Sequence, residues 1–189
     1  GALLQTLTTI AGGANWSVSP SALTPAAQYT VQATQSDAAG NTGTSSSSTF
    51  VIDTTAPSPA VIAPTHNGAT NSTKPILSGT AGNATATTAT SPDVTAVTVN
   101  IYAGATATGT ALQTFTPAVT ASTWSVASAS YTAALAANAQ YTVQVTQTDG
   151  AGNSGSGTST FVVDTTAPSP TISTPTNNAY LRSTTPTFT

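Results

Sequence analysis

Alternation of apolar and polar side chains marks the clearest strands of this chain. A period of two residues is typical of a half-buried β-strand, because successive side chains point to opposite faces. Two stretches show it, VTVNIY at residues 97–102 and YTVQVTQ at residues 141–147. The side chains that share one face in each stretch are apolar: Val97, Val99 and Ile101 in the first, and Tyr141, Val143 and Val145 in the second.

Five shorter apolar runs complete a set of seven predicted strands between residues 58 and 168. They lie near Val61, Leu77, Phe115, Trp124 and Phe161, and Gly, Pro, Asn and Ser separate them. Seven short strands in about 111 residues, divided by turn residues, are typical of an immunoglobulin-like sandwich. The pattern therefore predicts an all-β fold.

Composition supports this fold class and excludes several functions. Only 4% of the residues are charged, there is no Cys or Met, and the net charge is -3. Few long helix formers are present, and the weak negative charge offers no basic surface for nucleic acid. Disulfides are excluded. No apolar run is long enough to span a bilayer, and the first residues lack the basic start of a signal peptide.

Comparison of the chain with itself reveals a repeat. The sequence DTTAPSP occurs at residues 53–59 and again at residues 164–170. QYTVQATQSDAAGN, starting at Gln28, matches QYTVQVTQTDGAGN, starting at Gln140, with an offset one residue larger. We expect the one-residue difference to fall in the Ser/Thr/Gly-rich stretch between these motifs.

The repeat divides the chain into three parts. Residues 1–57 correspond to the C-terminal half of a repeat, residues 58–168 to a complete one, and residues 169–189 to the first segment of the next. We therefore expect a tandem array of sandwiches, of which this chain is a window. Half a sandwich leaves an apolar face uncovered, so the incomplete parts are expected to need partners from further sequence or from neighbouring chains.

Large aromatic side chains recur at matching positions of the repeat. They are Trp124, Phe161 and Tyr141 in the complete copy, and Trp16, Phe50 and Tyr29 in the first copy. Such residues dominate sandwich cores, so all six are predicted to pack inside. Tyr141 is also placed for a tyrosine-corner hydrogen bond. A carbohydrate-stacking platform would instead require Trp16 or Trp124 to be exposed.

Four motifs together resemble the bacterial Ig-like repeats that occur in tandem in large secreted adhesins and biofilm-associated surface proteins. The motifs are DTTAPSP, the SGTAG after Pro75, the WS strand, and YTVQVTQTDGAGN. The resemblance covers nearly the whole chain and implies an extracellular, non-catalytic spacer or stalk. One departure is NATATTATSPD, residues 83–93, which reads as an insertion between the second and third strands.

Acidic residues are expected to meet where repeats join. In this topology the loops that carry Asp93 and Asp149 lie at the end of the sandwich where the chain begins, and Asp53 ends the preceding copy. End-to-end stacking would therefore bring these three side chains together. Asp37 and Asp164 would occupy the same positions at junctions whose other halves are not in this sequence.

Two interpretations of these acids remain open. Like charges repel, and Ca²⁺ would offset this by taking oxygen ligands from the carboxylates and from Asn153, with Asp37, Asn41 and Asp164 as the corresponding ligands elsewhere. The resemblance also implies junctional Ca²⁺. Alternatively, the aspartates make only local hydrogen bonds in the AGN turns and at the Thr-Thr-Ala-Pro corner.

Catalysis has little support in the sequence. There is one histidine and no Glu or Cys, and His66 lies in a turn-like THNG stretch that reads as a solvated loop. Three functions remain: a structural module of a surface protein or filament, a head that binds carbohydrate or a host surface through the loop 82–94, and a subunit completed by strands from neighbouring chains.

Overall fold

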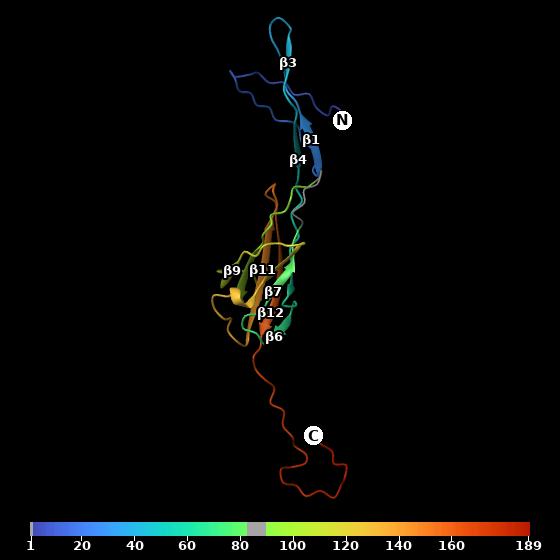
Figure 1. Cartoon of the computed structure of the whole chain (residues 1–189), viewed down its shortest axis with the longest axis vertical. Helices are drawn as coiled ribbons and strands as arrows, with labels where there is room; N and C mark the ends of the chain where they lie inside the picture. The colour runs from blue at the N-terminus through green and yellow to red at the C-terminus, as the bar shows by residue number, and fades with distance from the viewer. Residues whose placement is uncertain (1, 83–89) are drawn as a thin grey trace.

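The computed structural model describes residues 2–82 and 90–189, and these residues fold into strands without any α-helix (Figure 1). One short 3₁₀ turn spans Ser128–Ser130. The strands are β1 (Ala27–Val31), β2 (Thr34–Ser36), β3 (Thr42–Thr44), β4 (Ser48–Ile52), β5 (Ala60–Ala63), β6 (Gly68–Thr70), β7 (Leu77–Thr80), β8 (Thr98–Ala103), β9 (Gln113–Phe115), β10 (Thr123–Val126), β11 (Ala139–Thr148) and β12 (Ser154–Val163).

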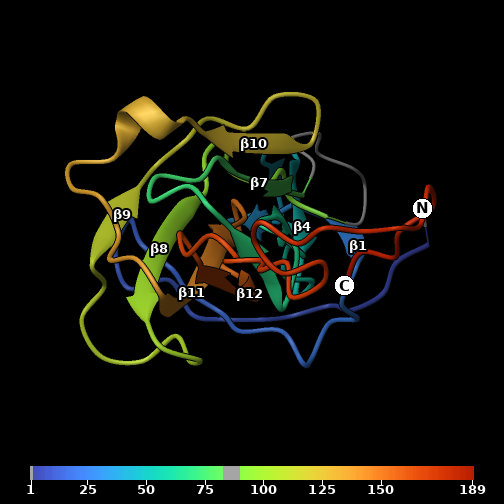
Figure 2. The same ribbon diagram turned by 90° about the horizontal axis from the view of Figure 1, so that it is seen from below.

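Strands β5 to β12 form two facing sheets, which confirms the predicted immunoglobulin-like sandwich. One sheet has the order β6-β12-β11-β8-β9 and the other the order β10-β7-β5. The two layers are seen edge-on in Figure 2, with β7 and β10 on one side and β8, β11 and β12 on the other. All seven predicted strands are present.

An eighth strand, β6, was not predicted. The first strand switches sheets after Ala63: β5 pairs antiparallel with β7, and β6 then runs parallel to β12. The stretch that contains β6, THNGAT, has turn residues at its start and too few apolar residues to show a strand period.

The core of the sandwich is built from the predicted faces. Val99, Ile101, Val143 and Val145 are fully buried, and so is Phe161. The indole N–H of Trp124 donates to the carbonyl of Thr80 at 2.9 Å. The Tyr141 hydroxyl donates to the carbonyl of Ala136 at 3.1 Å, which confirms the tyrosine corner.

Residues 2–57 contain the first-copy counterpart of the β11–β12 hairpin. Its ladder is interrupted in the middle, so that it forms two short pairs of strands. β1 pairs with β4 from Ala27↔Ile52, and β2 pairs with β3 from Thr34↔Thr44, in the registers of the matching parts of β11 and β12. Between the two ladders Ser45 donates its backbone N–H to the carbonyl of Ala33 and its hydroxyl accepts the N–H of Ala33. The extra residue of the first copy lies at this break, in the predicted Ser-rich stretch.

The prediction that the first-copy aromatics are core residues is wrong for two of them. Trp16 is 54% exposed and Phe50 is 39% exposed. Their local geometry is nonetheless that of a sandwich, since Tyr29 and Phe50 stack at 5.8 Å as Tyr141 and Phe161 do. Exposure follows because no second sheet faces β1 and β4 among the strands of residues 2–57.

Residues 169–189 contain no assigned strand, but they make the backbone hydrogen bonds of the first strand pair of a repeat. Thr174 and Thr189 exchange backbone hydrogen bonds, at the positions that correspond to the paired Ala63 and Ser78. This segment and the β1–β4 ladder lie at opposite ends of an elongated molecule, with the sandwich between them (Figure 1).

Candidate functional site

The candidate site is the junction where β4 continues into β5. Its parts are the linker, residues 53–59, the turn 149–153 that joins β11 to β12, and residues 90–94 ahead of β8. Residues 90–94 run antiparallel to the start of this turn: the N–H of Val94 donates to the carbonyl of Thr148, and that of Gly150 donates to the carbonyl of Pro92, both at 2.9 Å. Asp93 and Asp149 form a backbone bridge.

The Asp149 side chain is committed to its own turn. Its Oδ1 accepts the backbone N–H groups of Ala151 and Asn153 at 2.9 and 2.8 Å, and its Oδ2 accepts the Asn153 amide at 2.7 Å. Only 5% of Asp149 is exposed. These are the local hydrogen bonds that the second interpretation of the sequence predicts.

The exposed Asp37 turn has the same construction. Asp37 accepts the N–H groups of Ala39 and Asn41 at 2.9 Å and the Asn41 amide at 2.8 Å. The hydrogen bonds from Asn41, the side-chain amide first, lower the pKa of Asp37 below its usual value. The turn therefore forms from local sequence without a neighbouring repeat against it.

Asp53 connects the linker to the sandwich that follows. Its Oδ2 accepts both the N–H and the hydroxyl of Ser91 at 2.7 Å, and its Oδ1 accepts the N–H of Thr55 at 2.9 Å. Its backbone carbonyl accepts the Asn153 amide at 3.2 Å. The bonds to its carboxylate, led by that from the Ser91 hydroxyl, lower the pKa of Asp53. Asp164 makes the same cap, accepting the N–H of Thr166 at 2.9 Å.

Two glycines of β12 let the linker backbone lie directly on the sheet. A Cβ atom at Gly155 would overlap the carbonyl of Pro57, and one at Gly157 would overlap the carbonyl of Pro59. Both prolines are buried. The small residues of the GNSGSG stretch therefore position the linker.

Gln147 is a structural residue that the sequence analysis missed. It is 2% exposed, accepts the N–H of Gly82 at 2.7 Å and donates to the carbonyl of Val94 at 2.9 Å. It thereby ties together the two ends of the predicted loop 82–94, of which residues 83–89 lie outside the described residues. The signal was present, because Gln147 continues the inward face of Tyr141, Val143 and Val145.

The predicted calcium ligands come together only in part. Asp53 and Asp149 share the Asn153 amide, which donates to the Asp53 carbonyl at 3.2 Å and to the Asp149 carboxylate at 2.7 Å, and the carboxylate of Asp93 packs against Gly82. Across residues 2–82 and 90–189, however, no three acidic or histidine side chains are arranged as a set that could hold a metal ion. N–H and hydroxyl donors surround the carboxylates of Asp53 and Asp149. Asp37 and Asn41 belong to the turn between β2 and β3, and Asp164 follows the other end of β12, so these three residues are not part of this junction.

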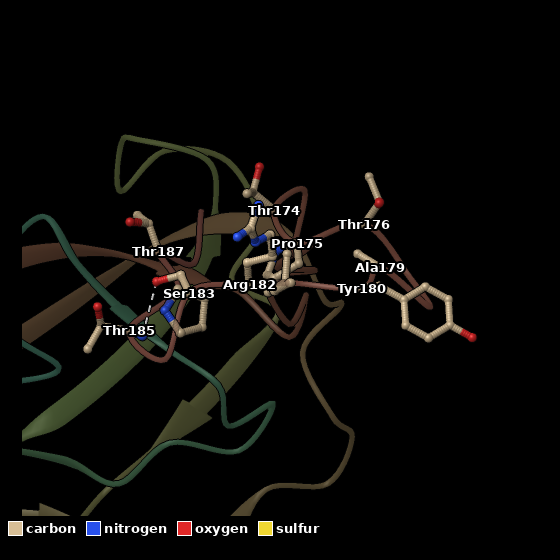
Figure 3. A pocket seen from close by; sticks show the side chains of 11 residues that line it. Thr174, Pro175, Thr176, Ala179, Tyr180, Arg182, Ser183, Thr185 and Thr187 are labelled. Atoms are coloured by element: carbon tan, nitrogen blue, oxygen red, sulfur yellow. Dashed lines mark hydrogen bonds between the residues drawn. The ribbon is translucent and has the colours of Figure 1, made fainter.

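A histidine and a surface hollow are two other features among the residues that the structure describes. His66 is an exposed loop residue, as predicted, and its Nδ1 lies 3.2 Å from the backbone nitrogen of Thr160. An open hollow of about 560 Å³ lies within residues 174–187 (Figure 3). Its lining is exposed apart from the partly buried Pro175 and Pro186, and Tyr180 points away from it. No helix in the described part of the chain is long and apolar enough to cross a membrane.

Comparison with known proteins identifies one family. Residues 3–54 match the family of bacterial Ig-like domains. No curated protein matches the chain. The first part of the chain is therefore similar to a bacterial Ig-like domain, which agrees with the all-β sandwich that the structure contains.

Proposed function

We propose that the chain is a non-catalytic spacer from the stalk of an extracellular bacterial surface protein, in which each linker docks on the repeat that follows it. The bacterial Ig-like match and the tandem organisation support a structural module. The observation that carries the proposal is the burial of the linker: Asp53, Pro57 and Pro59 are all buried against the sandwich.

Docking would make the array behave as a rod. Proline fixes φ at two linker positions, and the bonds to Asp53 hold the start of the linker against Ser91 and Asn153. The carbonyls of Pro57 and Pro59 rest on β12. A linker held at several points transmits orientation from one sandwich to the next, whereas a free linker would let each sandwich reorient independently.

Distances between spin labels test this proposal, because the chain contains no cysteine. One label pair, Ser47→Cys with Thr106→Cys, spans the junction, and a control pair, Thr106→Cys with Ala134→Cys, lies within the sandwich. All three positions are exposed. We expect a narrow distance distribution for both pairs in the otherwise unchanged protein.

Removing the two side-chain hydrogen bonds to Asp53, from Ser91 and Asn153, should affect only the pair that spans the junction. We expect Ser91→Ala combined with Asn153→Ala to broaden that distribution and to leave the control pair unchanged. Asn41→Ala changes the matching turn between β2 and β3, which is not part of the junction. This substitution should broaden neither of the two distance distributions. The spacer proposal would be contradicted if the distance distribution of the pair that spans the junction were as broad before these substitutions as after them.

Calcium binding at the junction is a second and separate proposal. It is supported by the Asn153 amide that Asp53 and Asp149 share, and by the absence of any Lys or Arg other than Lys74 and Arg182 in the sequence. Calorimetric titration of the metal-free protein with Ca²⁺ should give saturable heat that Asp53→Asn abolishes and Asp37→Asn preserves. No saturable heat would reject the ion and leave the docked spacer intact.

One observation favours an alternative function, that of a ligand-binding head. Trp16 is exposed, as a carbohydrate platform requires, whereas Trp124, the tryptophan near the loop 82–94, is 2% exposed. Titration with mixed polysaccharides, followed by tryptophan emission, would favour this alternative if Trp16→Ala abolished a saturable change.

A further inference from the structure

The first strand of the complete repeat, β5 continued by β6, runs beside the last strand, β12, in the same direction. Successive contacts follow β12 from its start to its end: Pro57 with Gly155, Pro59 with Gly157, Gly68 with Phe161, and Thr70 with Val163. The pairing of β6 with β12 is accordingly parallel. We call the contact of residues 64–70 with residues 159–164 the seam.

The two strands continue into the rest of the chain at opposite ends of the sandwich. Residues 2–52 lead into β5 at one end, and residues 165–189 leave β12 at the other (Figure 1). A pull on both segments therefore drives the first strand and β12 past each other along their length. Because ladder hydrogen bonds run between the strands, this sliding loads all of them at once, whereas a pull across the strands would break them one after another.

Backbone and side-chain hydrogen bonds both cross the seam. The N–H of Asn67 donates to the carbonyl of Thr160 at 2.8 Å. The N–H of Asp164 donates to the carbonyl of Thr70 at 2.9 Å. The Thr160 hydroxyl donates to Oδ1 of Asn67 at 2.7 Å, and the Thr160 backbone N–H donates to Nδ1 of His66 at 3.2 Å. The seam is thus linked more densely than its short ladder alone would provide.

The first strand is the one that sliding would detach. β12 is paired with β11 along all ten of its residues. The first strand has only three paired residues on β7 and three on β12, and the register of β5 shifts between Val61 and Ala63. Resistance to sliding therefore depends on the seam, where the side-chain hydrogen bonds supplement the ladder.

We propose that the seam is the force-bearing contact of the repeat, which resists unfolding when the two ends of the chain are pulled apart. This inference rests on the proposed function, because a spacer joined to further chain on both sides transmits tension through β5 and β12. It assigns to His66, Asn67 and Thr160 a role in linking the two strands through which tension enters the sandwich.

Force spectroscopy on the full chain, held at its two ends, tests the role of these side chains with a matched pair of substitutions. Thr160→Val removes the hydroxyl that donates to Asn67, and Thr114→Val removes a hydroxyl that donates to Asn100 at the same distance, 2.7 Å. The second bond joins β8 to β9, at the sheet edge opposite β6. We expect Thr160→Val to lower the unfolding force of the sandwich and Thr114→Val to leave it unchanged. Denaturant unfolding of both variants separates a lower force from a general loss of stability.

A second pulling direction tests the geometry without changing the seam. One handle is attached at Thr106→Cys, an exposed position in the loop after β8, and the other at the C-terminus. The end of β8 and the end of β12 lie at the same end of the sheet, since both flank the start of β11. This load separates the strands from that end, one hydrogen bond after another. We expect a force several-fold lower than when the chain is held at its two ends.

Two results would overturn the inference. One is a Thr160→Val variant that unfolds at the same force as the unchanged chain or as Thr114→Val. The other is a force in the second direction as high as in the first. Neither measurement reports the orientation of residues 53–59, which the spin labels follow. A weak seam would therefore leave the docked spacer standing, and a freely reorienting junction would reject the spacer whatever the force at the seam.

Discussion

The same seven residues, DTTAPSP, occupy two different environments in this molecule. At residues 53–59 the Asp and both prolines are buried, whereas all of residues 164–170 are exposed. The local cap is identical, because Asp53 and Asp164 each accept the N–H of the second residue after them at 2.9 Å. The corner is therefore encoded locally, but its burial is supplied by the following sandwich.

The hairpin of strands β1 to β4 and the β11–β12 hairpin also share local geometry but differ in burial. The turn bonds of Asp37 match those of Asp149, and the Tyr29 hydroxyl donates to the carbonyl of Thr24 at 3.1 Å as Tyr141 does to Ala136. Yet the side chains of the first hairpin are exposed or half-buried, while those of the second form a core. Turn and ladder geometry thus do not require the burial that stabilises a sandwich.

The largest expected difference between the copies is at the paired tryptophans. Trp124→Ala should destabilise the sandwich by about 3–5 kcal/mol, because it leaves a cavity in the core and removes the hydrogen bond from the indole to the Thr80 carbonyl. Trp16→Ala should cost about 0.5 kcal/mol or less, as is usual for surface substitutions. Denaturant unfolding of both variants measures the difference, and equal losses would mean that Trp16 is buried in solution.

A smaller difference is expected at the paired glycines of the hairpins. Gly155→Ala places a Cβ against the carbonyl of Pro57 and should cost about 1–3 kcal/mol, as overpacking does. Gly43→Ala meets only the Gln35 carbonyl at 3.9 Å and should be nearly neutral. Thermal unfolding compares the two variants. A neutral Gly155→Ala would mean that the linker is not seated on β12.

The smallest expected effect is a change in the pKa of Asp53 at the junction. The Ser91 hydroxyl lowers the pKa of Asp53, so Ser91→Ala should raise that pKa toward its usual value. A depressed pKa stabilises the folded state above the pKa of the unfolded chain, and this contribution is lost as pH falls through the folded-state pKa. Ser91→Ala should therefore reduce the acid sensitivity of the junction.

Carboxyl NMR titration measures this pKa and contains its own control. The pKa of Asp37 is lowered by Asn41 and should not respond to Ser91→Ala. An unchanged titration of Asp53 in the variant would show that Ser91 does not bind it in solution.

Much of the fold could be predicted because its signals are local. Alternation gave the inward faces of β8 and β11, and the repeat located the inserted residue near Ser45. The position of Tyr141 predicted a tyrosine-corner hydrogen bond, which the structure shows from its hydroxyl to the Ala136 carbonyl. Each of these depends on residues within a few positions of one another, or on comparison with a second copy.

The remainder depends on what packs against each segment. The exposure of Trp16 and Phe50 could not be read from sequence, because their sequence context matches that of buried residues and only the missing second sheet distinguishes them. β6 depends on pairing with β12, whose partner residues lie 93 positions later in the sequence. The sequence left the role of the aspartates open: the local hydrogen bonds of Asp149 and Asp53 are present, and calcium stays a prediction.

Amide ¹⁵N relaxation at the two linker copies tests linker docking most directly, since both copies can be observed in one sample. Ala56 and Ser58 should have order parameters close to those of β12, about 0.85, whereas Ala167 and Ser169 should fall below about 0.6. Equal order parameters at the two copies, high or low, would contradict the conclusion that the following sandwich immobilises the linker.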